Sequence, residues 1–414
     1  MRAALTVALR QGSFVGAGRD AGVSAAYAAA AAGAVGARRV SGATRAAGAC
    51  VRLAGLAALL LTGIPAFAAP SLEGVKLPAG FHIEVWQDDV PLAREMAISP
   101  KGTVFVGTMR FGKPSQDVYA IRTVNGKRTV SKLLTGLNNP NGVALRDGNL
   151  YVAEVHQIVR YDDIENHLDK PPNPVLITHL PTEQHHGWRY IAFGPDGKLY
   201  VAVGAPCNVC DKGAQGYAQI IRMNPDGKER EPIAKGVRNS VGFDWQPGSN
   251  KFWFTDNGRD ELGDNVPDCE LNRLDKIGDH FGFPFCHAGE IPDPEFGKLG
   301  SCAASVKPAL KLGPHVAPLA VRFYTGKQFP EAYRNQAFIA QHGSWNRSTP
   351  IGYRIMLVKL NGDRVTGYEE FATGWLKPNG EVSGRPVDLQ LLPDGSMLVS
   401  DDQEGAIYRI SYRK

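Results

Sequence analysis

After residue 70 the sequence contains no apolar run of 18 residues, which excludes a protein with several membrane-spanning helices. It also lacks a basic excess outside its N-terminus. Seven of the 46 Lys and Arg and one of the 41 Asp and Glu lie in residues 1–68, so the remaining 346 residues carry 39 basic and 40 acidic side chains. A nucleic-acid-binding domain normally keeps a basic patch, and we therefore expect no nucleic-acid partner.

Cysteine is scarce, and its spacing excludes several metal and haem sites. Of the six cysteines, Cys50 lies near the N-terminus and five follow residue 68, so at most two disulfides form there and one thiol remains. Cys207 and Cys210 form a C-x-x-C pair, but no His follows it, which excludes c-type haem attachment, and no second such pair completes a zinc tetrad. We expect a loop disulfide at this pair in preference to a redox motif, and the pairing of the cysteines stays open.

Residues 1–68 have the pattern of an extended export signal. Arg52 precedes an apolar stretch at 53–64, and an A-x-A cleavage site stands before Ala69. The apolar stretch is too short to span a bilayer, although an uncleaved membrane anchor is the alternative. We expect a periplasmic protein that is either free or associated with the membrane. The long lead-in before Arg52 also raises the hypothesis that translation starts near Val51.

A turn followed by a strand recurs six times along the rest of the chain. Gly102, Gly148 and Gly197 lie in the first three turns, at spacings of 46 and 49 residues, which is the length of one four-stranded propeller blade. Each segment begins with turn-forming residues and continues with β-branched and aromatic ones. The six segments are SPKGTVFVGT (99–108), LRDGNLYVAE (145–154), GPDGKLYVAV (194–203), QPGSNKFWFTD (246–256), NQAFIAQHG (335–343) and LPDGSMLVSD (392–401).

This repeat predicts an all-β fold, a six-bladed β-propeller that occupies residues 69–414, with the ring itself at about 75–413. A long acidic, Cys-containing insertion follows the fourth repeat strand. We expect the segment 81–87 to pair with the segment 406–412, which would close the ring and remove its free edges. A ring of seven or eight blades with one degenerate blade is the alternative. The fold alone names no function.

Candidate functional side chains lie directly before or after the repeat strands. His186 follows His185 ahead of the third repeat strand, and a neutral imidazole is a natural general base. Arg238 offers a fixed fork of donors for a carboxylate or an oxyanion, and Asn239 follows it. The alternatives are satisfied loop histidines and an Arg–Asp pair between blades. Further candidates are His342, Trp345, Asn346, Arg347, Arg385 and Asp388.

The segment 255–279 is crowded with hard oxygen ligands and turn residues. Ca²⁺ takes 6–8 oxygens in flexible geometry, which this composition suits, although the segment lacks the EF-hand register. A solvated acidic loop is the alternative. The acidic and amide side chains are Asp256, Asp260, Glu261, Asp264, Asp268, Glu270, Asp275, Asp279, Asn257, Asn265 and Asn272.

Five motifs, in a fixed order, resemble those of the glucose/sorbosone dehydrogenase family, with the greatest likeness to its L-sorbosone dehydrogenase branch and to soluble aldose sugar dehydrogenase-like proteins. The resemblance covers residues 75–412, and the ordered run is specific although GPDG alone is not. It implies an exported propeller that binds pyrroloquinoline quinone (PQQ) and Ca²⁺. The motifs are HHGWRYIAFGPDGKLYVAVG (185–204), GVRNSVGFDW (236–245), DNG…PDCELN (256–272), HGSWNR (342–347) and GRPVDLQLLPDG (384–395).

The resemblance also implies roles for individual residues. His186 falls at the position of the general base, and Arg238 and Asn239 match a pair that contacts the quinone and the substrate oxygens, which gives Arg238 a part in catalysis. Arg385 matches an Arg that contacts the quinone carboxylates. The remaining cofactor contacts implied are Asn141, His342 and Arg347.

For calcium, the resemblance implies the backbone carbonyls of Asn257 and Gly258 and the later acidic stretch with Asp268 and Glu270. Cys269 interrupts that stretch, and the loop is longer than the family's pattern. The implied reaction is oxidation of an aldose or of L-sorbosone by hydride transfer to the quinone, with electrons passing to an unidentified quinone or cytochrome. The alternatives are a calcium-dependent propeller hydrolase or lactonase, and a non-enzymatic periplasmic sugar-binding propeller.

Overall fold

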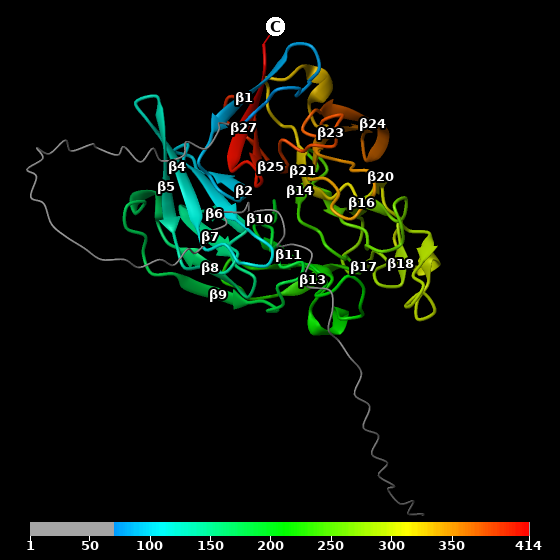
Figure 1. Cartoon of the computed structure of the whole chain (residues 1–414). Helices are drawn as coiled ribbons and strands as arrows, with labels where there is room; N and C mark the ends of the chain where they lie inside the picture. The colour runs from blue at the N-terminus through cyan, green and yellow to red at the C-terminus, as the bar shows by residue number, and fades with distance from the viewer. Residues whose placement is uncertain (1–69, 414) are drawn as a thin grey trace, which may run out of the picture. The chain divides into compact units, whose positions relative to one another are not determined.

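The computed structural model, which describes residues 70–413, contains six sheets of four or five strands and one small two-stranded sheet, β18 (Cys286–His287) with β19 (Ile291–Pro292). The predicted leader, residues 1–68, lies outside the described residues. Within residues 70–413 no helix is long and apolar enough to cross a membrane. Figure 1 shows the sheets arranged around a centre, with the first and last strands side by side. The predicted six-bladed propeller is therefore confirmed.

Each blade contains a four-stranded antiparallel meander, and all six predicted repeat segments form the second strand of a blade. Blades 1 to 3 are β2 (Ala93–Ile98), β3 (Val104–Thr108), β4 (Val118–Val124), β5 (Lys127–Leu134); β6 (Gly142–Arg146), β7 (Asn149–Ala153), β8 (Gln157–Tyr161), β9 (Val175–His179); and β10 (Ile191–Phe193), β11 (Leu199–Val203), β12 (Gln219–Met223), β13 (Glu231–Lys235). Blades 4 to 6 are β14 (Phe243–Trp245), β15 (Phe252–Asp256), β16 (Asp268–Leu274), β20 (Leu310–Pro314); β21 (Pro318–Phe323), β22 (Ala337–Gln341), β23 (Arg354–Asn361), β24 (Arg364–Ala372); and β25 (Pro386–Leu391), β26 (Met397–Asp401), β27 (Ala406–Tyr412), β1 (Phe81–Gln87). In blade 3 a fifth strand, β17 (Asp279–His280), pairs in parallel with the outer strand β13.

The ring closes as predicted, because β1 pairs antiparallel with β27 from Phe81↔Tyr412 to Gln87↔Ile407. Six apolar clusters lie between neighbouring blades, so each blade buries both of its faces. Phe105 of blade 1 and Leu150 of blade 2, for example, belong to the same cluster. This continuous burial makes the blade-to-blade packing the core of the fold.

The acidic segment after the fourth repeat strand differs in one respect from the predicted insertion. Asp268 and Glu270 lie on β16, the third strand of blade 4, and not on a loop. The true excursion is 275–309, between β16 and β20, and it holds the short strands β17 (Asp279–His280), β18 (Cys286–His287) and β19 (Ile291–Pro292). The short 3₁₀ turns of the described residues are η1 (Ile164–Asn166), η2 (Gly213–Gln215), η3 (Cys302–Ala304) and η4 (Glu331–Tyr333).

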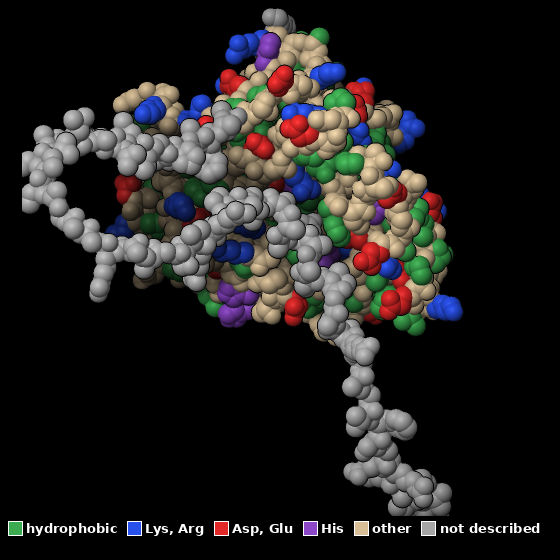
Figure 2. All heavy atoms as spheres, in the orientation of Figure 1, with side chains coloured by type: hydrophobic (Ala, Val, Ile, Leu, Met, Phe, Trp, Pro, Cys, Tyr) green, Lys and Arg blue, Asp and Glu red, His purple; other side chains and the backbone are tan. Residues whose placement is uncertain are grey.

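The cysteines follow the predicted arithmetic. Cys207 pairs with Cys210, Cys286 pairs with Cys302, and Cys269 is a buried free thiol. The second disulfide ties β18 to η3 inside the excursion. On the face shown in Figure 2, acidic and basic side chains are interspersed, in keeping with their nearly equal numbers after residue 68.

Candidate functional site at one end of the propeller channel

The predicted site residues share one end of the ring because of strand direction. In an antiparallel meander, successive connections lie at opposite ends of the sheet, so every second connection lies at the same end. The connections after the second and after the fourth strand of each blade therefore meet at one end, here called the channel mouth. Asn141, His186, Arg238, Asn239, Asn257, Gly258, His342, Arg347 and Arg385 all lie in such connections, and Asp268 and Glu270 begin β16 at the same end.

Ala205 links His186 to Arg238. The Nδ1 atom of His186 lies 2.8 Å from the carbonyl oxygen of Ala205, and the Ala205 amide donates to the carbonyl of Arg238 at 2.7 Å. Because a carbonyl oxygen only accepts, Nδ1 carries the proton and Nε2 keeps its lone pair. The close approach requires glycine at 204, since a Cβ there would lie 2.6 Å from the Cβ of His186.

His186 is held neutral at this position. It is buried, and its backbone adopts the left-handed region with φ 50°. Burial lowers the pKa of His186 well below its usual range, and the Arg238 cation and His185 lower it further. A neutral imidazole with an open Nε2 lone pair can accept a proton, which is the chemistry predicted for this residue.

Arg238 is buried with all five of its N–H donors engaged by the protein. Its Nε and Nη2 atoms donate to the backbone and side-chain oxygens of Asn208, each at 2.8 Å. Nη1 donates to the carbonyls of Asn257 and Gly258, and Nη2 also donates to Asp260. The guanidinium thus contributes fixed positive charge to the mouth, while its hydrogen bonds hold the loop that follows β15.

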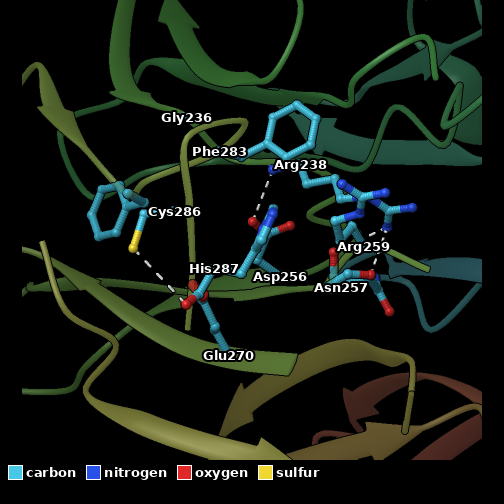
Figure 3. A pocket seen from close by; sticks show the side chains of 11 residues that line it. Gly236, Arg238, Asp256, Asn257, Arg259, Glu270, Phe283, Cys286 and His287 are labelled. Carbon is cyan, nitrogen blue, oxygen red and sulfur yellow. Dashed lines mark hydrogen bonds between the residues drawn. The ribbon is translucent and has the colours of Figure 1, made fainter. Parts of the chain in front are cut away.

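Two buried carboxyls face each other beside Arg238. Asp256 on β15 and Glu270 on β16 are paired across the sheet, and Figure 3 shows both side chains at a small polar cavity that Asn257 and Gly258 also line. Burial raises the pKa of Asp256 to about 7, and burial together with the neighbouring Asp256 raises the pKa of Glu270 to about 8. Asp268, the fourth predicted calcium ligand, does not line this cavity.

The residues predicted to bind calcium are therefore not assembled as one complete set. The carbonyls of Asn257 and Gly258 accept from Arg238, while Glu270 accepts from the Ala288 amide and from Asn272. Within residues 70–413 no cluster of three or more His, Cys, Asp or Glu could hold a metal. Buried amide oxygens of Asn239 and Asn272 lack hydrogen-bond partners near the carboxyl pair, so a cation there would have both carboxylate and amide oxygens available.

A second cluster joins four blades around the mouth. The Nε2 atom of His342 contacts Asp402 at 2.8 Å, and Arg94 donates to Asp402 and to Asn141 at 2.8 and 3.1 Å. Arg385 donates to the carbonyl of His342 at 3.1 Å. The structure thus brings three predicted residues, Asn141, His342 and Arg385, into one network. Burial lowers the pKa of His342 to about 4, so its ring is neutral near pH 7.

The mouth also has unused capacity for an anionic ligand. Arg385 and Arg347 donate to uncharged oxygens, and within the described part of the chain neither forms an ion pair with a carboxylate. Buried polar atoms without partners gather in the same connections, namely His185 Nε2, Asn239 Oδ1, Ser240 Oγ, Asn346 Oδ1 and Arg347 Nε. The guanidiniums of Arg347 and Arg385 suit the carboxylates and carbonyl oxygens of a planar ligand, whereas the amide oxygens of Asn239 and Asn346 can only accept from a donor such as a hydroxyl.

Deeper in the channel lies a polar cluster that bears on the hydrolase alternative. Glu95, Asn141 and Asp388 come from three blades and line a small cavity. The same cavity is lined by the apolar residues Val241, Leu319 and Val387, and the Arg322 guanidinium approaches Asp388 at 4.0 Å. The Arg322 guanidinium already offsets the negative charge of these carboxyls. The cluster therefore favours a structural role in filling the channel over a catalytic metal centre.

Sequence reasoning missed several residues of the mouth. Arg94 and Asp402 precede or follow repeat strands without belonging to a recognised motif, and their contact spans 308 residues. Asn208 lies between Cys207 and Cys210, and no motif marks it as a partner of Arg238. The Asp293–His287 pair of the excursion, 2.8 Å apart, gave no spacing signal.

A closed six-bladed ring with a neutral imidazole and several guanidiniums at one mouth defines a propeller with a polar site for an anionic ligand. The chain belongs to the TrAA12-like family, whose model matches residues 75–413. A Borreliella burgdorferi protein described as uncharacterized is 34% identical over 370 residues, which are 86% of this chain and 95% of that protein. A pyrroloquinoline quinone-dependent pyranose dehydrogenase of Coprinopsis cinerea is 32% identical over 127 residues, which are 26% of this chain and 17% of that protein.

Solved structures share the fold. The Trichoderma reesei carbohydrate-active enzyme of family AA12, in its iodide structure, has a TM-score of 0.70 at 20% identity and covers 84% of this chain and 98% of its own. The holo PQQ domain of the C. cinerea pyranose dehydrogenase has a TM-score of 0.69 at 19% identity, covering 83% of this chain and 98% of its own. The resemblance to PQQ-dependent sugar dehydrogenases predicted from the motifs is confirmed at the level of the family.

Proposed function

We propose that this chain is a PQQ-dependent oxidoreductase that oxidises an aldose or a sugar aldehyde such as L-sorbosone. The observation that carries the proposal is the buried, neutral His186, whose Nδ1 donates to the Ala205 carbonyl and whose pKa is lowered by the Arg238 cation. Relatives support the substrate class, since one is named a pyranose dehydrogenase and an Escherichia coli relative, 24% identical over 262 residues, is named an aldose sugar dehydrogenase.

In the proposed reaction, His186 accepts the hydroxyl proton from the anomeric carbon of the sugar, or from a hydrated aldehyde, at Nε2. The Nδ1–H bond to Ala205 fixes the ring orientation and keeps Nε2 unprotonated. PQQ, when bound, supplies a two-electron acceptor for the C–H hydride, and Ca²⁺ would supply a Lewis acid. Low pKa at His186 keeps the base available down to acidic pH.

Arg385 and Arg347, which have no carboxylate partners in the described chain, would hold the quinone carboxylates. Arg238 would add positive charge, and the amide oxygen of Asn239, which has no hydrogen-bond partner, would accept from a hydroxyl of the sugar. Asn141 and His342 would act through the Arg94–Asp402 network that orients them.

For calcium, we propose Asp256 and Glu270 as the carboxylate ligands, in place of the complete predicted set Asn257, Gly258, Asp268 and Glu270. Two buried carboxyls with raised pKa values gain most from a divalent cation, because it stabilises their ionised forms. The Asn257 and Gly258 carbonyls would join only if Arg238 released them.

We further propose that the chain is exported and passes its electrons to a second redox partner. Residues 1–68 would direct export to the periplasm and leave residues 69–414 as the mature enzyme, either free or membrane-associated. Electrons would pass from the reduced cofactor to a quinone or a cytochrome. The partner proposed for the site is a small sugar, and no nucleic acid is involved.

Reconstitution tests the proposal. Purified protein is loaded with PQQ and CaCl₂, and dye reduction is followed across a panel of aldoses, L-sorbosone and sugar lactones. We expect sugar-dependent reduction that needs PQQ, and no lactone hydrolysis. Hydrolysis of a lactone without PQQ, together with no dye reduction by any sugar, would replace the dehydrogenase with the hydrolase alternative.

A further inference from the structure

The C-x-x-C disulfide lies in a connection at the channel mouth. It encloses a polar residue, Asn208, that contacts Arg238. Cys207 and Cys210 are bonded across a separation of three residues, in the connection between β11 and β12. Asn208 stands inside this ring and is half-buried. Such a short covalent ring restricts the backbone of the residues that it encloses, and thus the direction of the Asn208 carbonyl.

Two oxygens of Asn208 accept hydrogen bonds from Arg238. Its backbone carbonyl accepts from Arg238 Nε and its Oδ1 accepts from Nη2, each at 2.8 Å. These two parallel bonds engage one edge of the planar guanidinium and fix its plane.

The same amide group also holds the loop on the far side of Arg238. Asn208 Oδ1 accepts from the Asp260 amide at 2.9 Å, and Nδ2 donates to the Asp260 carbonyl at 3.2 Å and to Glu261 at 3.3 Å. Asp260 in turn contacts Arg238 through Oδ2 at 3.1 Å and accepts from Asn346 at 2.8 Å. Asn208 is therefore the residue that joins blades 3 and 4 around the guanidinium.

We propose that Asn208, fixed by the Cys207–Cys210 ring, is the positioning residue that sets the Arg238 guanidinium at the mouth. The expected effect on PQQ binding rests on the proposed function, whereas the expected effect on the His186 pKa does not. Arg238 is one of the groups that face His186, together with His185 and Arg189. Moving the guanidinium away would weaken its electrostatic effect on the His186 ring.

Variants at 208 separate positioning from general stability. Asn208→Ala removes Oδ1 and Nδ2, whereas Asn208→Asp keeps an oxygen that can accept from Arg238. Asn379→Ala, at an exposed amide that bonds only to Glu381, is the matched control. The readouts are the His186 pKa by NMR titration of the folded protein, the Kd for PQQ, and the split between kcat and KM.

We expect Asn208→Ala to raise the His186 pKa and to weaken PQQ binding by about tenfold, the effect of lost charge-assisted hydrogen bonds. Asn208→Asp keeps an acceptor for Arg238 but adds a carboxylate beside it, which by itself raises the His186 pKa, so the deciding comparison is Asn208→Ala with the wild type. Asn379→Ala should change neither property. Arg238→Met removes the guanidinium altogether, so the His186 pKa of that variant gives the upper limit for the shift that a displaced Arg238 can cause. A folded Asn208→Ala protein with the wild-type His186 pKa and the wild-type Kd for PQQ would overturn the inference.

Cysteine variants test the ring itself. Cys207→Ser with Cys210→Ser should move the His186 pKa and the PQQ Kd in the direction of Asn208→Ala. Asn379→Ala again serves as the control, because Cys286 of the other disulfide lines the cavity beside Arg238. A folded double variant with the wild-type His186 pKa and the wild-type Kd for PQQ would refute the role of the ring. If the wild type binds no PQQ, the proposed function fails while the His186 titration still decides the positioning role.

Discussion

Without divalent cations, the free energy of unfolding should fall as pH rises. The Glu270→Gln variant should show much less of this fall. The folded pKa values of Asp256 and Glu270 are raised to about 7 and about 8. A carboxyl whose folded pKa is raised contributes stability that is fully present below the unfolded pKa, near 4, and is lost as pH rises through the folded pKa. For this pair the loss should therefore fall between about pH 4 and pH 8.

The size of the effect follows from the proton linkage. While the unfolded carboxyl is ionised and the folded one is protonated, each pH unit costs about 1.4 kcal/mol. Between pH 5 and pH 8, one such carboxyl would change the free energy of unfolding by up to about 4 kcal/mol, which lowers Tm by several degrees in a chain of this size. Gln at 270 removes one titrating group, and its amide can donate to the unpaired oxygen of Asn272.

The assay is thermal unfolding of EDTA-treated protein from pH 5 to pH 8, with and without added CaCl₂. Glu295→Gln, an exposed carboxyl of the same excursion, is the control. The wild type should lose stability as pH rises and regain it with CaCl₂, most strongly at pH 8, whereas Glu270→Gln should show a flatter profile and little response. A wild type whose Tm neither falls with pH after chelation nor rises with CaCl₂ would refute both the buried carboxyl pair and its proposed cation.

Three further perturbations are directed at the mouth. His186→Gln should lower kcat by about 10²–10⁴ without loss of PQQ binding, and near-normal turnover would show that His186 only holds the loop. Gly204→Ala should lower both activity and Tm, because the new Cβ would lie 2.6 Å from the Cβ of His186; an unchanged Tm would mean that the backbone yields easily there. Arg94→Met should destabilise the fold by about 1–3 kcal/mol in chemical unfolding, because the half-buried Asp402 loses that cation and keeps only His342; no measurable loss would show that His342 alone suffices.

The architecture was accessible from the sequence because the second strand of every blade carries the same turn-then-strand chemistry. Gly102, Gly148 and Gly197 all adopt positive φ, the backbone state that their turn positions require. The closure of β1 on β27 also followed, since a propeller without it would leave a free edge.

The details of the site were less accessible because they depend on contacts between distant segments. Asp268 and Glu270 were expected on a loop, but pairing with β15 and β20 places them on β16, whose burial does not alternate. Arg94 and Asp402 have no local pattern, and only ring closure brings them together. Asn208 acts through its backbone carbonyl as well as its side chain, and no residue pattern reports the direction of a carbonyl.

Single-turnover reduction of the bound quinone is the most direct test of the central claim. Protein loaded with PQQ and CaCl₂ is mixed with an aldose in a stopped-flow instrument, and the quinone absorbance is followed. The account predicts rapid loss of the quinone signal, severalfold slower with the sugar deuterated at its anomeric carbon, and nearly abolished in His186→Gln. A quinone that binds but is not reduced by any aldose or by L-sorbosone would contradict it.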